Sequence, residues 1–207
     1  MILLLLAGAT TRVLVTGQYV SYVKAGLWPL LAISAVLTAL FAFTRGHQPR
    51  VGWLLVVPVL ALLLIQPQSL GSYAASNAGT VLQQSDEYPP LPAGDPVEIK
   101  VFDYASRAVF DQGRTLEDRR VKLLGFTSTG PNGERLLVRM ILTCCAADGR
   151  PVKIAMRNAP VLPDDTWVEV TGSYVDSATA DGVNGEKIPF IDVESTTQVE
   201  QPERPYE

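Results

Sequence analysis

The apolar positions of this chain follow two different patterns. In the first 70 residues they form long runs with few polar interruptions, and from residue 97 onward they alternate with polar positions in short segments. Long apolar runs are typical of membrane-spanning helices, whereas alternation with a period of two is typical of strands with one buried face. We therefore expect membrane helices over residues 1–70, a linker over 71–96, a β-rich domain over 97–200 and a tail over 201–207.

The first region divides into three apolar segments, at about residues 2–22, 27–44 and 51–70. A membrane-spanning helix needs about 20 mostly apolar residues, and the second and third segments approach that length. Pro58 in the third segment is tolerated in a membrane, because neighbouring helices satisfy the backbone groups that a proline leaves unpaired. Buried core helices of a soluble protein are the alternative, which two such runs in close succession disfavour.

The first segment carries Arg12 near its middle. An arginine at the centre of a spanning helix costs about 2.5–3.5 kcal/mol on insertion scales. The segment therefore spans the membrane with Arg12 facing other helices or a partner, lies in the interface, or is a signal peptide that lacks a basic residue before Ile2. We favour the spanning helix, in which Arg12 is a partner or intramembrane contact.

The charges along the chain indicate its orientation. The first acidic residue is Asp86, so all 21 acidic residues lie in the second part of the chain. The loop Thr44–Arg50 holds two arginines, while the loop near Lys24 holds one lysine. Basic residues accumulate in cytoplasmic loops. The pattern predicts a multi-pass protein of the plasma membrane, in contact with lipid, whose Thr44–Arg50 loop is cytoplasmic and whose C-terminal domain is extracytoplasmic.

Residues 71–96 are rich in Ser, Ala, Gly, Asn and Pro, which is typical of an extended linker. Beyond it, Val97–Phe102 alternates like a strand, and Asp103 is placed to cap a short helix that ends near Phe110. The strands that the alternation predicts next are Arg120–Thr127, Arg135–Leu142, Val152–Met156, Thr166–Tyr174 and Ile188–Val193.

These five short strands predict an all-β, five-stranded barrel of the OB type. Gly125 and Gly172 fall at positions where barrel strands bend, and an Asn132-Gly133 turn separates the first two strands of the five. A β-sandwich is the alternative, but it normally needs about seven strands.

The most unusual local feature is the pair Cys144-Cys145, followed by Asp148. Thiolates and a carboxylate are ligands for a zinc-like metal ion. Because adjacent residues on a strand point to opposite faces, both sulfurs reach one ion only if the backbone turns over Ala146–Gly149. The alternatives are a vicinal disulfide in an oxidising compartment, or one cysteine that packs as a small apolar residue. Two cysteines fall short of the four ligands of a structural zinc site.

Signatures of conventional enzymes are absent from the sequence, which contains no G-x-S-x-G, P-loop or H-E-x-x-H motif. The sole histidine, His47, lies in the loop expected to be cytoplasmic, on the opposite side of the membrane from Cys144. From Asp95 onward, 13 basic and 19 acidic residues give a net charge of −6, which repels phosphate backbones. We therefore expect neither an acid–base enzyme nor a nucleic-acid-binding protein.

Three motifs resemble those of a known family. They are Gly125-Phe126, the run Arg139-Met140-Ile141-Leu142-Thr143-Cys144-Cys145-Ala146-Ala147-Asp148, and Trp167-Val168-Glu169-Val170-Thr171-Gly172. Together with the apolar N-terminal segments, they resemble the YcgQ-like family of uncharacterised bacterial membrane proteins, described as subunits of a two-component permease. The CCAAD run is the most specific part of the resemblance, and Gly149 departs from it, where alanine is expected. The resemblance implies a multi-helix permease as partner and an association with metal homeostasis, particularly that of zinc.

From these observations we expect an accessory subunit of a membrane permease complex, whose extracytoplasmic OB-like domain binds a metal or solute. The candidate metal ligands are Cys144, Cys145 and Asp148. The alternative is a stand-alone protein of the cell envelope that handles metal or redox equivalents, or mediates interactions, through the cysteine pair.

Overall fold

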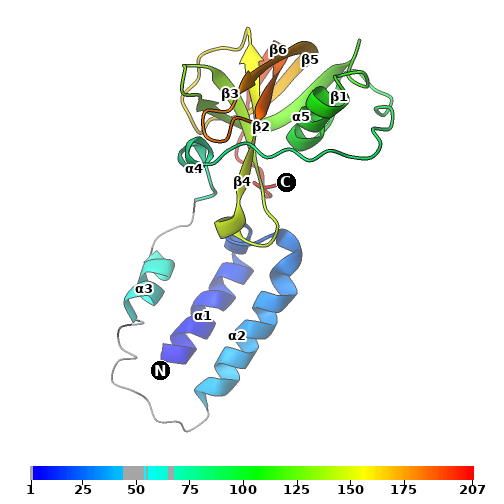
Figure 1. The fold of residues 1–207 in the computed structure, drawn as a ribbon. Helices are drawn as coiled ribbons and strands as arrows, with labels where there is room; N and C mark the ends of the chain where they lie inside the picture. Colours follow the sequence, from blue (N-terminus) through cyan, green and yellow to red (C-terminus); the bar gives the residue numbers. More distant parts are fainter. Residues whose placement is uncertain (1, 44–53, 55, 65–67) are drawn as a thin grey trace. The chain divides into compact units, whose positions relative to one another are not determined.

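The computed structural model describes residues 2–43, 54, 56–64 and 68–207 (Figure 1). The chain forms two compact units, of which the first comprises Met1–Ser69 with Thr143–Ala147, and the second Leu70–Leu142 with Asp148–Glu207. The expected cytoplasmic loop Thr44–Arg50, which includes His47, lies outside the described residues.

The first unit is helical. Its elements are α1 (Ile2–Val15), η1 (Gln18–Ser21), η2 (Ala25–Leu27), α2 (Trp28–Ala42) and α3 (Val56–Leu64). Helix α1 packs against α2 and also contacts α3. The buried residues of α1 and α2 are all small, namely Ala7, Ala9 and Ala35. Small residues let two helices approach closely, as is common in membranes.

Within the described residues, Ala25–Ala42 is the one helical segment whose length and composition suffice to cross a membrane, and only 6% of it is buried. The helix Ile2–Val15 is apolar but shorter. The sequence predicted one continuous helix over residues 2–22, and that prediction is wrong. Gly17 adopts a left-handed conformation (φ 73°) directly after α1, which ends the helix, and the short turn η1 follows.

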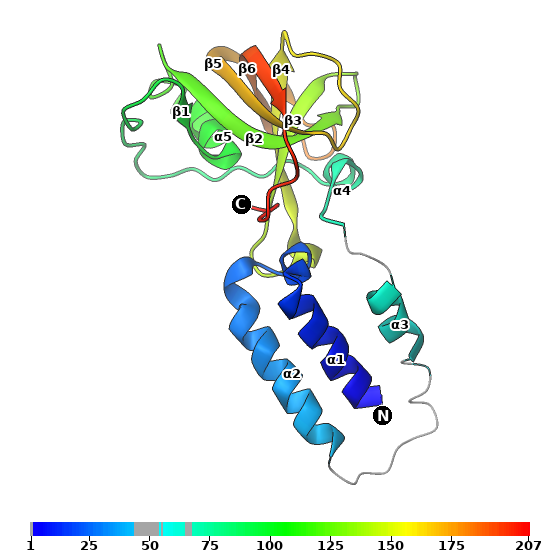
Figure 2. The same ribbon diagram turned by 180° about the vertical axis from the view of Figure 1, so that it is seen from behind.

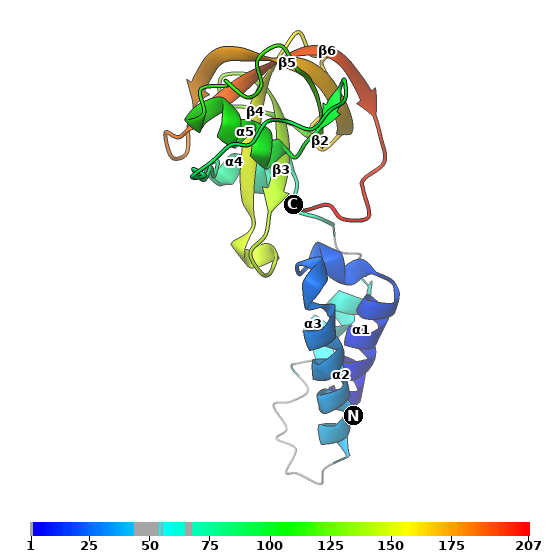
Figure 3. The ribbon, with the colours of Figure 1, turned by 90° about the vertical axis from the view of Figure 1, so that its right-hand side faces the viewer.

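The second unit contains a closed five-stranded barrel, which confirms the predicted strand number. Its elements are β1 (Val97–Glu98), β2 (Arg120–Thr129), β3 (Arg135–Ile141), β4 (Arg150–Arg157), β5 (Trp167–Ala180) and β6 (Lys187–Gln198). The strands follow the order β2-β3-β4-β6-β5, and β5 pairs with β2 to close the barrel (Figure 3). The pairing of β4 with β6 is parallel, and the other pairings in the ring are antiparallel.

Strand β1 is shorter than the predicted strand Val97–Phe102, because the chain enters helix α5 (Val101–Phe110). The buried residues Val101, Tyr104, Ala105 and Ala108 are three or four positions apart, as on one face of a helix. This helical spacing begins at Val101 and overrides the alternation that precedes it.

The strands carry buried clusters on both faces. On β3, Leu137 belongs to one cluster together with α5, whereas Leu136, Val138 and Met140 belong to a second cluster. The alternation of neighbouring residues between clusters is the period of two that the sequence displays.

The segment expected to be a linker packs on the barrel unit instead (Figure 2). It contains helix α4 (Ser72–Asn77), whose Ala75 is buried in the second cluster. Further along, Thr80 and Leu91 are also buried. The proline-rich part is held by arginines, since Arg107 donates a hydrogen bond to the carbonyl of Pro89 and Arg119 to that of Pro92. The small residues and prolines of this segment therefore pack against the barrel unit instead of forming an extended linker.

Candidate metal centre

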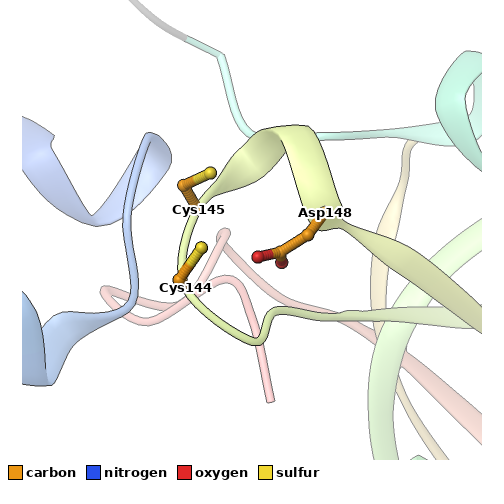
Figure 4. Close-up of side chains that lie close together, drawn as sticks. All are labelled: Cys144, Cys145 and Asp148. Atoms are coloured by element: carbon orange, nitrogen blue, oxygen red, sulfur yellow. The ribbon is translucent and has the colours of Figure 1, made fainter.

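The cysteine pair lies in the connection between β3 and β4. Strand β3 ends at Ile141, β4 begins at Arg150, and the 3-10 turn η4 occupies Ala146–Asp148 (Figure 4). The backbone therefore turns directly after the cysteines, as the binding of one ion by both sulfurs requires. The two side chains are not held on opposite faces, as they would be on a continuous strand.

Cys144, Cys145 and Asp148 come together within this short stretch of chain. The two sulfurs and a carboxylate oxygen all lie within 4.8 Å of one another, and Figure 4 shows the Asp148 carboxylate turned toward the sulfurs. In a tetrahedral zinc site with Zn–S bonds of about 2.3 Å, two sulfurs are roughly 3.8 Å apart. The three ligand atoms thus need to close by about 1 Å at most to bind one ion.

The exposure of the cluster suits ligand exchange. Cys144 is exposed, Cys145 and Asp148 are half-buried, and both cysteines are thiols. Neither cysteine is therefore packed in a core, as one alternative from the sequence had it. Three protein ligands leave one position of a tetrahedral ion open, which is typical of zinc sites that exchange a ligand.

The backbone of the cysteine pair is fixed to the segment between α1 and α2. The amide of Lys24 donates a hydrogen bond to the carbonyl of Cys144 (3.0 Å), and the amide of Ala146 donates to the carbonyl of Tyr22 (2.7 Å). Val23 and Cys145 form an isolated antiparallel bridge. These contacts all lie within the first unit, so the cysteines are positioned by the end of the apolar helical hairpin.

Arg12 lies elsewhere than the sequence suggested. Because α1 ends at Val15, Arg12 belongs to its last turn and is exposed, instead of lying at the centre of a long helix. A cation near a helix C-terminus interacts favourably with the helix dipole.

Two buried ionic groups in the barrel unit were not anticipated from the sequence. Lys153 and Asp181 form an ion pair of 2.8 Å with side chains only 5% and 2% exposed. Arg139 and Glu207 face each other at 4.0 Å with side chains 7% and 10% exposed. The sequence offered one signal of burial, because Lys153 and Arg139 are each flanked by apolar residues within a strand. It gave no signal of their partners, which are remote in the sequence.

Residues 98–207, more than half of the chain, match the family model described as the DUF1980 C-terminal domain. The matched region includes the barrel, the cysteine pair and Asp148. No curated protein and no solved structure matches the chain.

Proposed function

The chain belongs to the DUF1980 C-terminal domain family, and we propose that this member is an accessory subunit of a membrane permease complex. In this proposal Cys144, Cys145 and Asp148 hold a zinc-like divalent ion, which is the cargo that the subunit presents to the permease. The subunit itself catalyses no reaction.

The observation that carries the proposal is the convergence of two sulfurs and a carboxylate oxygen within 4.8 Å. Thiolates favour borderline-soft ions such as zinc, and the carboxylate suits the same ion. An ion held by three protein ligands and reached through the exposed Cys144 is released more readily than one enclosed by four. The donor set therefore suits delivery better than permanent structural binding.

Further features of the chain support the proposal. The segment Ala25–Ala42 is long and apolar enough to span it, and the cysteine loop is hydrogen-bonded to Tyr22 and Lys24, just before that segment. The order of the barrel strands, with β4 and β6 parallel, is the order expected of the OB type, a fold that often serves binding. The likeness of the CCAAD run to the YcgQ-like family favours a multi-helix permease as partner and zinc as cargo. The arginines of Thr44–Arg50 favour an extracytoplasmic barrel in a multi-pass protein.

The metal-binding part is tested on the full chain, purified in detergent, stripped with a chelator and titrated with zinc. We expect about one zinc ion per chain, and proton release on binding because the thiols must ionise. C144S/C145S should bind none at this site, and D148N should bind at least tenfold more weakly. E200Q, which changes an exposed carboxylate outside the cluster, is the matched control and should bind as the wild type does. Equal zinc content in wild type and C144S/C145S contradicts the proposed site.

The permease part is tested by isolating a tagged full chain from its native membrane and identifying what accompanies it. We expect a multi-helix membrane protein in stoichiometric amount, in the wild type and in C144S/C145S alike. Isolation of the chain without such a protein contradicts the accessory role but leaves the metal site standing.

The adjacent thiols, one of them exposed, favour one alternative function, in which the chain alone handles redox equivalents. Oxidation by diamide would remove two electrons and two protons from Cys144 and Cys145, form one disulfide between them, and reduce diamide to its hydrazine. Thiol titration of the full chain before and after diamide measures this step. A fall from two thiols to none, reversed by dithiothreitol and prevented by bound zinc, supports the alternative, whereas two thiols before and after exclude it.

A further inference from the structure

A second polar site lies at the N-terminus of helix α5, within the barrel unit. A cavity of about 430 Å³ opens there, and the residues that line it include Lys100, Lys122, Arg139, Arg204 and Glu207. Cavities of roughly this size are typical of small-molecule sites. The polar groups around this cavity indicate which chemical class of molecule it accepts.

Arg139 is the central residue of this site. It is 6% exposed, its guanidinium lies 4.9 Å from the ring centre of Trp167, and its Nη2 donates a hydrogen bond to the Arg204 carbonyl (2.8 Å). Its Nε and Nη1 are fully buried and donate to no acceptor among the described residues. Buried donors are nearly always hydrogen-bonded. These two donors lie on different edges of the planar guanidinium, so a single anion accepts from only one of them, and Nε, which is on the side of Glu207, is the donor open to it.

The first turn of α5 supplies two further donors. The amides of Val101 and Phe102 donate to Oε1 and Oε2 of Glu207 at 3.1 and 3.2 Å. A helix N-terminus of this kind binds anions. Glu207 Oε1 is 4.0 Å from Arg139 Nε, which is too far for a hydrogen bond. The Glu207 carboxylate thus accepts hydrogen bonds from the helix amides but none from Arg139. Its burial raises the pKa of its carboxyl.

The charges that line this part of the cavity are not balanced. Lys122 is paired with Glu98 and Glu169, at 3.4 and 3.2 Å. Over the whole lining, four cations (Lys100, Lys122, Arg139 and Arg204) stand against three carboxylates (Glu98, Glu169 and Glu207), so the side chains carry an excess of one positive charge. The region therefore accepts a further anion.

Only the side chain of Glu207 must move for the site to admit a further anion. Its amide donates to the carbonyl of Met140 (3.0 Å), and its carbonyl accepts from the amide of Leu142 (3.4 Å). The hydroxyl of Tyr206 accepts a hydrogen bond from the amide of Leu70 (2.9 Å). The backbone of the tail is held in place, so rotation of one side chain opens the site.

We infer that this cavity binds a small solute that carries a carboxylate, and that the solute's carboxylate takes the place of the Glu207 side chain on the first turn of α5. In that position it accepts hydrogen bonds from the amides of Val101 and Phe102 and from the unused Nε donor of Arg139. Glu207 acts as a built-in competitor that occupies the site until the solute arrives. This site is independent of the metal centre at Cys144 and Cys145.

The experiment titrates succinate into the full chain in detergent by calorimetry, at constant ionic strength. We expect E207A to bind succinate at least tenfold more tightly than the wild type, because the competing carboxylate is gone. E207A/R139K should lose at least tenfold of that affinity, since lysine keeps the charge but not the Nε donor. C144S/C145S should bind succinate as the wild type does, which separates this site from the metal centre.

Three outcomes overturn the inference: no saturable succinate binding by E207A, equal binding by E207A and E207A/R139K, or the same response to potassium chloride at equal ionic strength. If E207A does not fold, E207Q serves instead, because it keeps the shape of the side chain and removes its charge. E207Q should also bind succinate at least tenfold more tightly than the wild type, and unchanged binding counts against the inference.

Discussion

Asp181, only 4% exposed, joins segments of the second unit that are far apart in the sequence. Its carboxylate accepts hydrogen bonds from Lys153 Nζ (2.8 Å) and from the amides of Thr80 (2.7 Å) and Val183 (2.9 Å). Lys153 Nζ also donates to the carbonyl of Ala78 (2.8 Å). The ion pair therefore fastens the segment before the barrel to β4 and to the turn between β5 and β6. Each charge is compensated, which is the condition for burying it.

We predict that D181N lowers the free energy of unfolding of the barrel by about 3–5 kcal/mol at pH 7, because it leaves the Lys153 ammonium buried without a counter-charge. Hydrogen exchange of barrel peptides in the full chain measures this change. The matched control is D95N, which breaks the exposed ion pair between Asp95 and Arg120 and should cost far less, because solvent screens an exposed pair. A similar cost for both variants contradicts the importance of burial.

The same pair predicts how stability depends on pH. Burial alone would raise the pKa of Asp181, but the hydrogen bonds from Lys153, Val183 and Thr80, with the charge of Lys153, together hold it below its ordinary value of 3.8. A lowered pKa gives stability that is present above the unfolded pKa and is lost as the pH falls through the folded one. The difference between wild type and D181N should therefore shrink below about pH 4. An equal difference at pH 3 and pH 7 would show that the charge is not responsible.

At the scale of elements, the backbones of strands β5 and β6 approach each other closely at Gly172. A Cβ atom on Gly172 would overlap the carbonyl oxygen of Asp192, and the pairing register shifts between Thr171 and Gly172. The absence of a side chain therefore permits the bend by which β5 pairs with both β2 and β6.

We predict that G172A destabilises the barrel by about 1–3 kcal/mol, because backbone must shift to admit one methyl group. Urea unfolding of the full chain in detergent, followed by hydrogen exchange of β5 and β6 peptides, measures the effect. S195A alters an exposed residue of β6 that pairs with Thr171, and it should change stability by less than about 0.5 kcal/mol. Unchanged stability in G172A would show that the strands relax around the methyl group without cost.

The elements also show which parts of the fold the sequence discloses. Alternation locates the five barrel strands to within a few residues at most ends, because each strand has buried positions two apart. It misplaces the boundary between β1 and α5, because Val101 satisfies both the strand and the helix period. The packing of residues 70–96 is not predictable from composition, since it depends on hydrogen bonds such as that from the Thr80 amide to Asp181, a residue remote in the sequence.

The candidate metal centre was predictable because its ligands are close in sequence, and one turn over Ala146–Asp148 brings them together. The carboxylate site was not predictable, because it requires β3, the first turn of α5 and the tail to meet. Sequence patterns describe single elements, and they do not show which distant segments come into contact until the register of the strands is known.

At the scale of the whole molecule, the two units differ in which surface they offer to solvent. Large apolar side chains of α2 are exposed, among them Leu30, Ile33 and Leu40, at 55–63%. The hydroxyl of Thr38 donates to the carbonyl of Ser34 (2.7 Å), so this polar group is satisfied within the helix. Such a surface suits hydrocarbon and not water. The exposed apolar faces therefore support the proposal that the first unit lies in lipid.

The cysteine pair reports on which side of that membrane the barrel lies, because the chain contains only these two cysteines and Cys144 is exposed. We predict that a membrane-impermeant maleimide labels the chain in intact cells, since the arginines of Thr44–Arg50 favour an extracytoplasmic barrel. Mass spectrometry of the isolated chain measures the labelling. C144S/C145S should take up no label.

The matched test of the opposite side is H47C in the C144S/C145S background, which moves the only thiol into the Thr44–Arg50 loop. It should be protected in intact cells and labelled after the cells are opened, because a cytoplasmic loop is out of reach of the reagent until then. The reverse pattern, with H47C labelled and the wild type protected, would place the barrel in the cytoplasm. The metal site would then deliver ions from the inside, where thiols stay reduced and a vicinal disulfide is disfavoured.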